Sequence, residues 1–171
     1  MIFNRIWCMP NSNTFLIPPI ADLIYRYVPP LGIGWVDPFA GNNSPAQFTN
    51  DLNPNTEADM HVKADVFVAG LSGFFDGVLL DPPYSLRQTK ECYKGIGIEK
   101  LTPAESKDGS FAKVKNIIAP QIKSGGYAIS FGWSSCGFGK NRGFDPDIVE
   151  ILLVPHGGHH NDTIVTVERK L

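Results

Sequence analysis

The chain has 171 residues, of which 43% are hydrophobic, and its formal net charge is −2 at pH 7. These values are typical of one globular domain covering residues 1–171 and exclude a disordered chain, and no stretch is long and apolar enough to span a membrane. The acidic balance argues against a dedicated nucleic-acid binder, whose phosphate contacts normally form a basic face. Three widely spaced cysteines indicate neither a disulfide framework nor a zinc pair, and without a secretory signal the expected location is the cytoplasm.

Proline, glycine and apolar periodicity divide the first half of the chain into elements. In chain order they predict a helix, two strands, a short helix and a third strand: Pro18–Tyr27, Ile33–Asp37, Gln47–Asp51, Val66–Leu71 and Gly77–Leu80. Only Pro38–Ala46 separates the first two strands, which is shorter than a parallel crossover with a helix usually needs. The first crossover helix should therefore be missing or one turn long.

The second half is predicted to hold two helices, a strand and a closing antiparallel hairpin. Their ranges are Ser85–Lys94 with Ser85 as the cap, Phe111–Ile122 ended by Gly125-Gly126, Tyr127–Trp133, and Ile148–Val154 with Thr163–Glu168. Short apolar runs bounded by Gly and Pro are typical of buried parallel strands. The sequence therefore predicts an α/β fold with a mostly parallel sheet and a C-terminal antiparallel hairpin.

The most informative segment is Asp81-Pro82-Pro83-Tyr84, which follows the apolar run Gly77–Leu80. It should lie past the carboxyl end of a buried strand, where open α/β sheets bind ligands. The prolines restrict the backbone, so that the Pro82 carbonyl can be aimed beside the Asp81 carboxylate. Two such acceptors can hold both hydrogens of a planar amine and turn its lone pair toward an incoming methyl group, while Tyr84 offers a ring for a base to stack on. The alternative is that Asp-Pro-Pro only ends the strand.

Acidic residues also follow the other predicted strands. Gly34–Gly41 repeats the pattern of an apolar run that ends in Asp-Pro before a glycine, so Asp37 is a candidate partner for a ligand ammonium. Asp51 follows the second strand, where nucleotide-binding sheets hold ribose hydroxyls. Asp65 precedes Val66 and can accept a hydrogen bond from an adenine amine.

These features, in this order, resemble the S-adenosylmethionine-dependent amino-methyltransferases of DNA, in the small adenine-N6 form with a DPPY motif that bacteriophages often carry. The resemblance covers nearly the whole chain, and Phe131-Gly132-Trp133 and His156–Arg169 also look like members of the phage group. It implies a Rossmann-like class I methyltransferase sheet, S-adenosylmethionine as cofactor and DNA as partner. It also implies that the catalytic residues are Asp81, Pro82, Pro83 and Tyr84, with the initial aspartate pointing to adenine more than to cytosine N4.

The same resemblance implies a cofactor site. Met9–Phe15 looks like the amino-terminal cofactor motif, Asp37–Gly41 like the methionine-binding loop, and Asp51 like the ribose acid. The implied cofactor-binding residues are Asn13, Thr14, Phe15, Asp37, Pro38, Phe39, Ala40, Gly41, Asp51, Leu52, Asp65, Val66 and Asp81, with Phe67 as an alternative to Val66 against the adenine ring. One departure is Asn43, where the family often has a glycine, and its side chain is expected to crowd the cofactor.

Cations near the motif and histidines in the last turn are the candidates for nucleic-acid contact. Arg87, Lys90 and Lys94 follow the motif, and Lys140 and Arg142 lie in a Gly-rich stretch. For both groups the alternative is an ordinary solvated surface. In relatives, a residue of the turn at 156–162 packs on the far face of the base, although a plain surface histidine is an equal alternative. The predicted nucleic-acid-binding residues are Tyr84, Arg87, Lys140, Arg142, His159 and His160. The histidine spacing fits no common zinc signature, so no metal site is predicted.

The sequence thus predicts direct methyl transfer from S-adenosylmethionine to adenine N6 of a flipped DNA base, in the cytoplasm of a bacterium or a phage-infected host. Cytosine N4, RNA adenine and a protein amide are alternative acceptors. A catalytically silent module that binds cofactor or nucleic acid is the alternative from another class, favoured by the short crossover, Asn43 and the acidic balance. Nothing resembles a separate target-recognition domain, so the chain is expected to recognise little sequence or to pair with itself as a homodimer.

Overall fold

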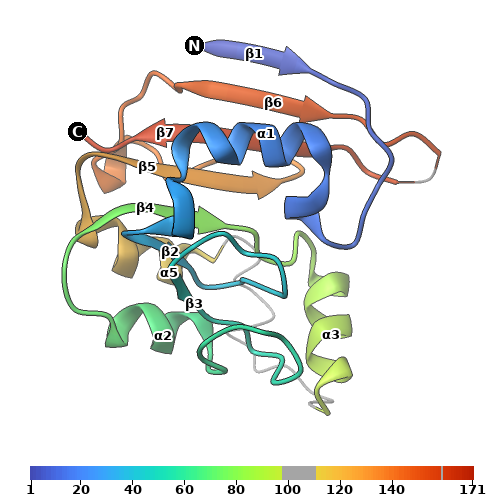
Figure 1. The fold of residues 1–171 in the computed structure, drawn as a ribbon, viewed down its shortest axis with the longest axis horizontal. Helices are drawn as coiled ribbons and strands as arrows, with labels where there is room; N and C mark the ends of the chain where they lie inside the picture. The colour runs from blue at the N-terminus through green and yellow to red at the C-terminus, as the bar shows by residue number, and fades with distance from the viewer. Residues whose placement is uncertain (98–110, 159) are drawn as a thin grey trace.

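The fold is a seven-stranded mixed sheet with the strand order β1-β6-β7-β5-β4-β2-β3. The computed structural model describes residues 1–97, 111–158 and 160–171, and Figure 1 shows their arrangement. The strands are β1 (Ile2–Arg5), β2 (Trp35–Asp37), β3 (Phe48–Thr49), β4 (Phe75–Leu80), β5 (Ile122–Gly132), β6 (Glu150–Val154) and β7 (Thr163–Arg169). β7 is antiparallel to β5 and β6, and the other pairs are parallel. The predicted sheet with its C-terminal antiparallel hairpin is confirmed.

Helices cover both faces of this sheet. α1 (Pro18–Tyr27) packs on one face, and α2 (Ala64–Gly70) and α5 (Ala112–Ile118) pack on the other. α3 (Leu86–Gly95) stands beyond the carboxyl ends of the strands (Figure 1). Short 3-10 turns complete the described elements: η1 (Thr14–Leu16), η2 (Pro30–Gly32), η3 (Ala119–Gln121) and η4 (Lys140–Arg142). None of the described helices is long and apolar enough to cross a membrane.

Alternation along the central strands builds two apolar layers. Trp35 and Leu79 belong to the layer under α1, whereas Val36 and Val78 belong to the layer under α2 and α5. Successive strand residues point to opposite faces, so each central strand is buried on both sides and reads as a continuous apolar run. The strands fit tightly: a Cβ at Gly77 would lie 2.6 Å from the Trp35 ring, so Gly77→Ala should force the sheet to shift.

The first crossover contains no helix, as predicted. Residues 38–47, between β2 and β3, form turns and irregular backbone. The loop is held to the end of β2 by a hydrogen bond from the Ser44 hydroxyl to Asp37 Oδ2, at 2.6 Å. In this crossover, which lacks a helix, a side-chain hydrogen bond fixes the loop against the sheet.

One strand was missed and one helix was predicted too long. β1 was not predicted, because three of its four residues are exposed and the strand lacks the apolar alternation that marks a buried strand. The helix predicted over Phe111–Ile122 ends at Ile118, where Pro120 removes a backbone donor and the chain tightens into η3. Gly125-Gly126, expected to end that helix, lies inside β5, and a Cβ at Gly126 would come within 2.7 Å of the Asp76 carbonyl.

Candidate active site

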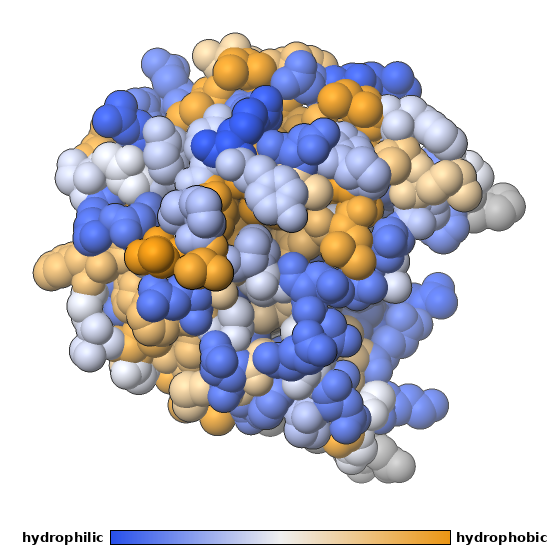
Figure 2. Space-filling view, in the orientation of Figure 1, coloured by the Kyte–Doolittle hydropathy of each residue, from blue (hydrophilic) through white to orange (hydrophobic). Residues whose placement is uncertain are grey.

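A cleft of about 1140 Å³ opens beyond the carboxyl ends of β2, β3, β4 and β5. Figure 2 shows the molecule hollowed on this side, with hydrophilic residues gathered over α3. A second cavity of about 110 Å³ adjoins the cleft, since Ser12, Thr14, Phe39 and Asp81 line both. The volume of the cleft lies slightly above the usual ~300–1,000 Å³ of a single small-molecule site, so it has room for more than one ligand.

Most of the predicted site residues meet in these two cavities. Those that line the cleft are Thr14, Pro38, Phe39, Asp51, Leu52, Asp65, Asp81, Pro82, Pro83, Tyr84, Arg87 and His160. The smaller cavity adds Asn13, Phe15, Ala40 and Gly41. Asp37, Val66, Lys140 and Arg142 line neither cavity, and His159 lies outside the described residues.

Asp81 is the first residue past the buried end of β4 and is fixed by neighbouring hydroxyls. The Tyr84 hydroxyl donates a hydrogen bond to Asp81 Oδ1, and the Thr14 hydroxyl hydrogen-bonds to the same pair. The chain then turns into α3, where Tyr84 N donates to Gln88 Oε1 at 2.6 Å and Gln88 N donates to Ser85 Oγ at 3.2 Å. The predicted Ser85 cap is confirmed.

A second acceptor lies next to this carboxylate. The Pro82 carbonyl accepts no hydrogen bond from any residue in the described ranges. Pro82 is half-buried and lines the cleft directly after Asp81. Asp81 and Pro82 together provide two adjacent acceptors.

Burial raises the pKa of Asp81 to about 6, although hydrogen bonds from Tyr84 and Thr14 lower it. The carboxylate is therefore ionised at neutral pH and protonated in mild acid. Burial and the Asp81 charge also raise the pKa of Tyr84 above its usual range. Tyr84 is thus a neutral hydrogen-bond donor at any ordinary pH.

Trp133 forms an aromatic pair with Tyr84 in the cleft, with 5.8 Å between ring centroids and an interplanar angle of 73°. Its side chain is 42% exposed. The site prediction missed this residue, although it stands directly after the buried end of β5, the same position relative to a strand that singled out the aspartates. An aromatic residue at a strand's carboxyl end was the signal that could have found it.

Asp37 lies behind the cavity wall. Its side chain is fully buried, and it accepts hydrogen bonds from Phe39 N at 2.9 Å and from the Ser44 hydroxyl at 2.6 Å. Burial raises its pKa to about 7, and the charges of Asp81 and Asp51 act in the same direction. Asp37 therefore orders its own loop in this structure, and its contact with a ligand ammonium stays an untested prediction.

Asp51 reaches the cleft and also braces the first loop. It accepts hydrogen bonds from Gly41 N at 3.0 Å and from Asn53 N at 2.8 Å. Gly41 has φ +55°, and no atom lies within 4 Å of where its Cβ would be. The open backbone at Gly41 leaves room for a ligand in the smaller cavity. Asn43 lines that cavity and has no left-handed backbone. The predicted crowding of the cofactor by its side chain stays a prediction.

Asp65 lies at the other side of the cleft in an ion pair with Lys113, at 2.6 Å between Nζ and Oδ2. This hydrogen bond keeps the pKa of Asp65 below its ordinary value. Val66 was predicted to face a cofactor but is 56% exposed and off the cavity, and Phe67 is buried in the core. The reason is geometric: α2 begins at Ala64, and each helical residue turns the side-chain direction by about 100°.

The site prediction also missed one aromatic and one cationic residue on this side of the cleft. Phe111 packs edge-on against Phe39 with ring centroids 4.9 Å apart and has a left-handed φ of +49°. Lys113 follows it on α5, and both line the cleft. Nothing in the local sequence around Phe111 indicates that it returns to a site built from loops up to a hundred residues earlier.

The two predicted cation groups lie in different places. Arg87 stands on the rim of the cleft and pairs with Glu91 at 2.8 Å. Arg142 donates to Asn116 Oδ1 and to the Phe138 carbonyl, each at 2.8 Å. η4 packs beside Lys170, at the amino end of β5 and therefore at the opposite end of the sheet. A role for Lys140 and Arg142 at the base site is not supported by this placement.

The turn between β6 and β7 has an irregular backbone, with positive φ at Gly157 and Gly158. His160 reaches the cleft and is exposed. His156 is buried, with Nδ1 3.0 Å from the Cys8 carbonyl and Nε2 2.8 Å from the Thr163 hydroxyl. It ties the amino-terminal segment to the last two strands. Within the described ranges, no group of three or more His, Cys, Asp or Glu residues could hold a metal ion.

The sequence matches no family model and no curated protein, but solved structures share its fold. TrmN from Thermus thermophilus superposes with a TM-score of 0.57 and 16% identity over 91% of this chain. The putative methyltransferase yhhF from Escherichia coli superposes with a TM-score of 0.55 and 9% identity, over 95% of this chain and 91% of its own. A conserved hypothetical protein from Streptococcus pyogenes superposes with a TM-score of 0.54 and 14% identity, over 90% of this chain and 94% of its own.

This chain spans about half the length of TrmN, of which 49% is covered. At these identities the likeness is one of fold, and the fold is the Rossmann-like α/β sheet of class I methyltransferases, with β7 antiparallel and strand order 3-2-4-5-7-6-1. The predicted fold class is confirmed.

Proposed function

We propose that this chain is an S-adenosylmethionine-dependent methyltransferase that methylates the N6 amino group of adenine in DNA, by direct transfer to a base flipped into the cleft. The observation that carries the proposal is the pair of acceptors at the end of β4. Asp81 and Pro82 share one cleft with Tyr84 and with Asp51, and the Pro82 carbonyl accepts no hydrogen bond from the described residues. The methyltransferase fold of the chain supports the cofactor class.

The residues present fit the proposed cofactor. Asp51 lines the cleft just past β3 and is proposed to accept hydrogen bonds from the ribose hydroxyls. The small cavity at Gly41 suits the amino-acid end, because it is narrow and open at the glycine backbone. Leu52 and Phe111 offer apolar walls for an adenine ring, with Asp65 nearby as an acceptor. When bound, the cofactor supplies the electrophilic methyl group.

The chain's own residues then have defined tasks. Asp81 and the Pro82 carbonyl accept the two hydrogens of the adenine amine, which localises the nitrogen lone pair. The Tyr84 hydroxyl now occupies one position on Asp81, but an ionised carboxylate has about four lone-pair sites, so the amine can be accepted beside the hydroxyl or in its place. Tyr84 and Trp133 provide rings for the base, each stack being worth ~1–3 kcal/mol against the cost of flipping. After transfer, the released proton goes to Asp81 or to water.

The test is incubation of the protein with labelled S-adenosylmethionine and unmodified DNA, followed by mass spectrometry of the digested nucleosides. The expected product is N6-methyladenine. Parallel arms with RNA and with protein extract separate the alternative acceptors, and N4-methylcytosine would redirect the proposal to that base. Cofactor binding without transfer to any acceptor would instead favour a silent binding module, and would sink the assignment of Asp81.

A further inference from the structure

The outer face of α3 carries a stripe of three cations, Arg87, Lys90 and Lys94, all exposed. Their spacing of three and four residues places them on one side of a helix. Thr89 and Cys92 lie on the opposite side and line the cleft. Arg87 and Glu91 stand at the rim and also line the cleft, so the cations that are turned away from the cleft are Lys90 and Lys94.

The charge of this face stands out on an acidic chain. α3 contains three cations and one carboxylate, Glu91, giving a net charge of +2, whereas the whole chain has −2. Glu91 is committed to Arg87 by the 2.8 Å ion pair. Lys90 and Lys94 form no ion pair with another residue of the described ranges. These two lysines stand one helical turn apart, and like charges at this spacing repel each other unless an anion lies between them.

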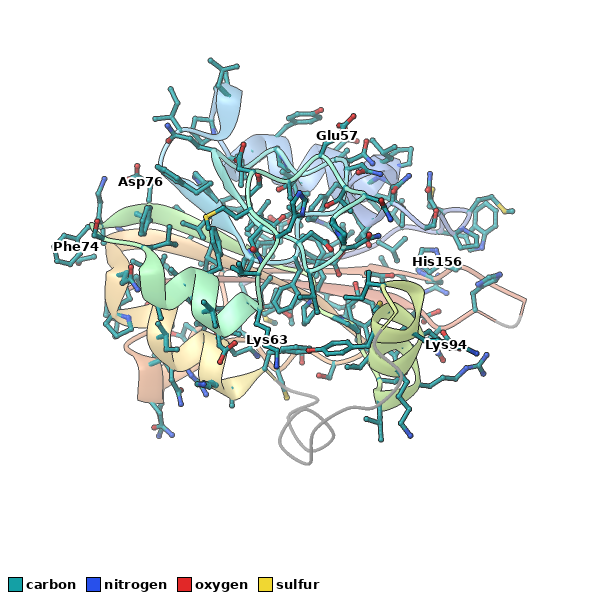
Figure 3. All side chains as sticks on the ribbon, turned by 90° about the horizontal axis from the view of Figure 1, so that it is seen from below. Glu57, Lys63, Phe74, Asp76, Lys94 and His156 are labelled. Carbon is teal, nitrogen blue, oxygen red and sulfur yellow. The ribbon has the colours of Figure 1, made fainter. Side chains whose placement is uncertain are left out.

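The stripe starts at the catalytic motif. Ser85, the residue after Tyr84, caps the helix, and Arg87 stands on the rim of the cleft. In Figure 3, α3 with Lys94 stands apart from α2 and Lys63. At a rise of 1.5 Å per residue, Arg87 to Lys94 spans about 10 Å, and one strand of a duplex presents about three phosphates over that length.

We infer that this stripe contacts the phosphodiester backbone of the nucleic acid whose base enters the cleft. The inference rests on the proposed function and adds the surface by which an acidic chain holds a polyanion. Lys140 and Arg142 do not compete for this role, because both lie on η4 at the far end of the sheet, where Arg142 is also hydrogen-bonded within the chain. Backbone contacts of this kind position a substrate without reading its sequence.

The experiment measures binding of a fluorescent DNA duplex by the wild type and by Lys90→Gln/Lys94→Gln, between about 50 and 200 mM salt. Each phosphate contact contributes a slope of about −0.9 to log K against log salt, so the double variant should lose about 1.8 from the slope. At 0.1 M salt this corresponds to roughly eightfold weaker binding for each lysine. Methyl transfer at saturating DNA should be unchanged, because both lysines lie outside the cleft lining.

Matched variants separate charge from other effects. Lys90→Arg/Lys94→Arg keeps the charges and should keep the slope. Lys123→Gln removes a half-exposed lysine at the amino end of β5, where it pairs with Asp76, and should leave the slope unchanged. The same measurement is made in parallel with an RNA of the same sequence. The nucleic acid for which Lys90→Gln/Lys94→Gln changes the salt slope more is the one that the stripe prefers.

The two proposals fail in different ways. If the wild type methylates a nucleic acid but the Lys90→Gln/Lys94→Gln variant keeps the wild-type slope and KM, the stripe is a solvated surface and this inference alone is overturned. If the wild type neither binds nor methylates any nucleic acid at low salt, the proposed function falls and the inference falls with it.

Discussion

The loop after β2 and the loop after β4 both begin with an aspartate and a proline at the carboxyl end of a buried parallel strand, yet only the second presents its carboxylate to the cleft. Asp37 is fully buried, with Phe39 N and the Ser44 hydroxyl as donors. Asp81 lines both cavities, and the hydroxyls of Tyr84 and Thr14 are its neighbours. Both aspartates have the same position in the fold, so the nearby hydrogen-bond donors determine whether each carboxylate is held by its own loop or faces the cleft.

The difference comes from the third residue of each loop. An aspartate readily accepts a hydrogen bond from the backbone N–H two residues on, and Phe39 supplies that N–H to Asp37. Pro83 occupies the equivalent place after Asp81 and has no N–H. The second proline therefore keeps the backbone from capturing the carboxylate and leaves it to side-chain hydroxyls that a substrate can displace.

The largest expected effect is at Asp81. Asp81→Asn replaces an acceptor oxygen by an NH2 group facing the substrate amine, and loss of one such preorganised group should lower the methylation rate by about 10²–10³-fold. Cofactor binding, measured by calorimetry, should change little. Since burial raises the pKa of Asp81 to about 6, the wild-type rate should also rise with pH through that value as the carboxylate ionises.

The outcome that breaks the comparison is an active Asp81→Asn variant. A rate within tenfold of the wild type would show that the carboxylate after β4, like the one after β2, only orders its own loop. A wild-type rate that does not depend on pH between about 5 and 7 would contradict the ionised form as the working one.

A smaller effect, on stability, is expected at Asp37. Its pKa rises from 3.8 to about 7 in the folded state, so the folded protein holds a proton that the unfolded chain releases. The stability linked to this proton is complete below pH 3.8 and is lost as pH rises through about 7, by at most about 4 kcal/mol. Asp37→Asn does not titrate, so urea unfolding should show a flatter loss of stability between pH 5 and pH 8.

Asp147→Asn, at an exposed aspartate, is the matched control for that experiment. The same Asp37→Asn protein also tests the predicted ligand contact. Its affinity for S-adenosylmethionine should fall by less than about tenfold, ~1.4 kcal/mol, if Asp37 acts only by ordering the loop. A loss of a hundredfold would mean that the carboxylate reaches the cofactor directly and would remove the distinction between the two loops.

The position of the cleft at the carboxyl ends of the strands could be predicted from the sequence, but the side-chain contacts within it could not. Apolar runs ended by Asp-Pro located the ends of β2 and β4 and hence most of the cleft, because parallel strands bring their carboxyl ends to one edge. The hydrogen bond from Ser44 to Asp37 joins residues seven positions apart and the Asp65–Lys113 pair joins residues 48 positions apart, and neither contact could be predicted from a local pattern. β1 escaped prediction for a related reason: an exposed edge strand has no burial pattern to display.

The smallest effect expected, and the sharpest test of the comparison, is at Pro83. Pro83→Ala supplies the N–H that Phe39 supplies after β2, so the backbone should now donate to Asp81. A hydrogen bond to the ionised form lowers the pKa, so the rise of the methylation rate should move to lower pH, and the rate at pH 8 should fall by about tenfold as the substrate competes with that donor. Pro82→Ala is the control, since it adds an N–H one residue earlier and keeps Pro83. If both variants leave the pH profile where it was, the missing N–H is not what opens Asp81 to the cleft, and the hydroxyls of Tyr84 and Thr14 must hold the carboxylate there by themselves.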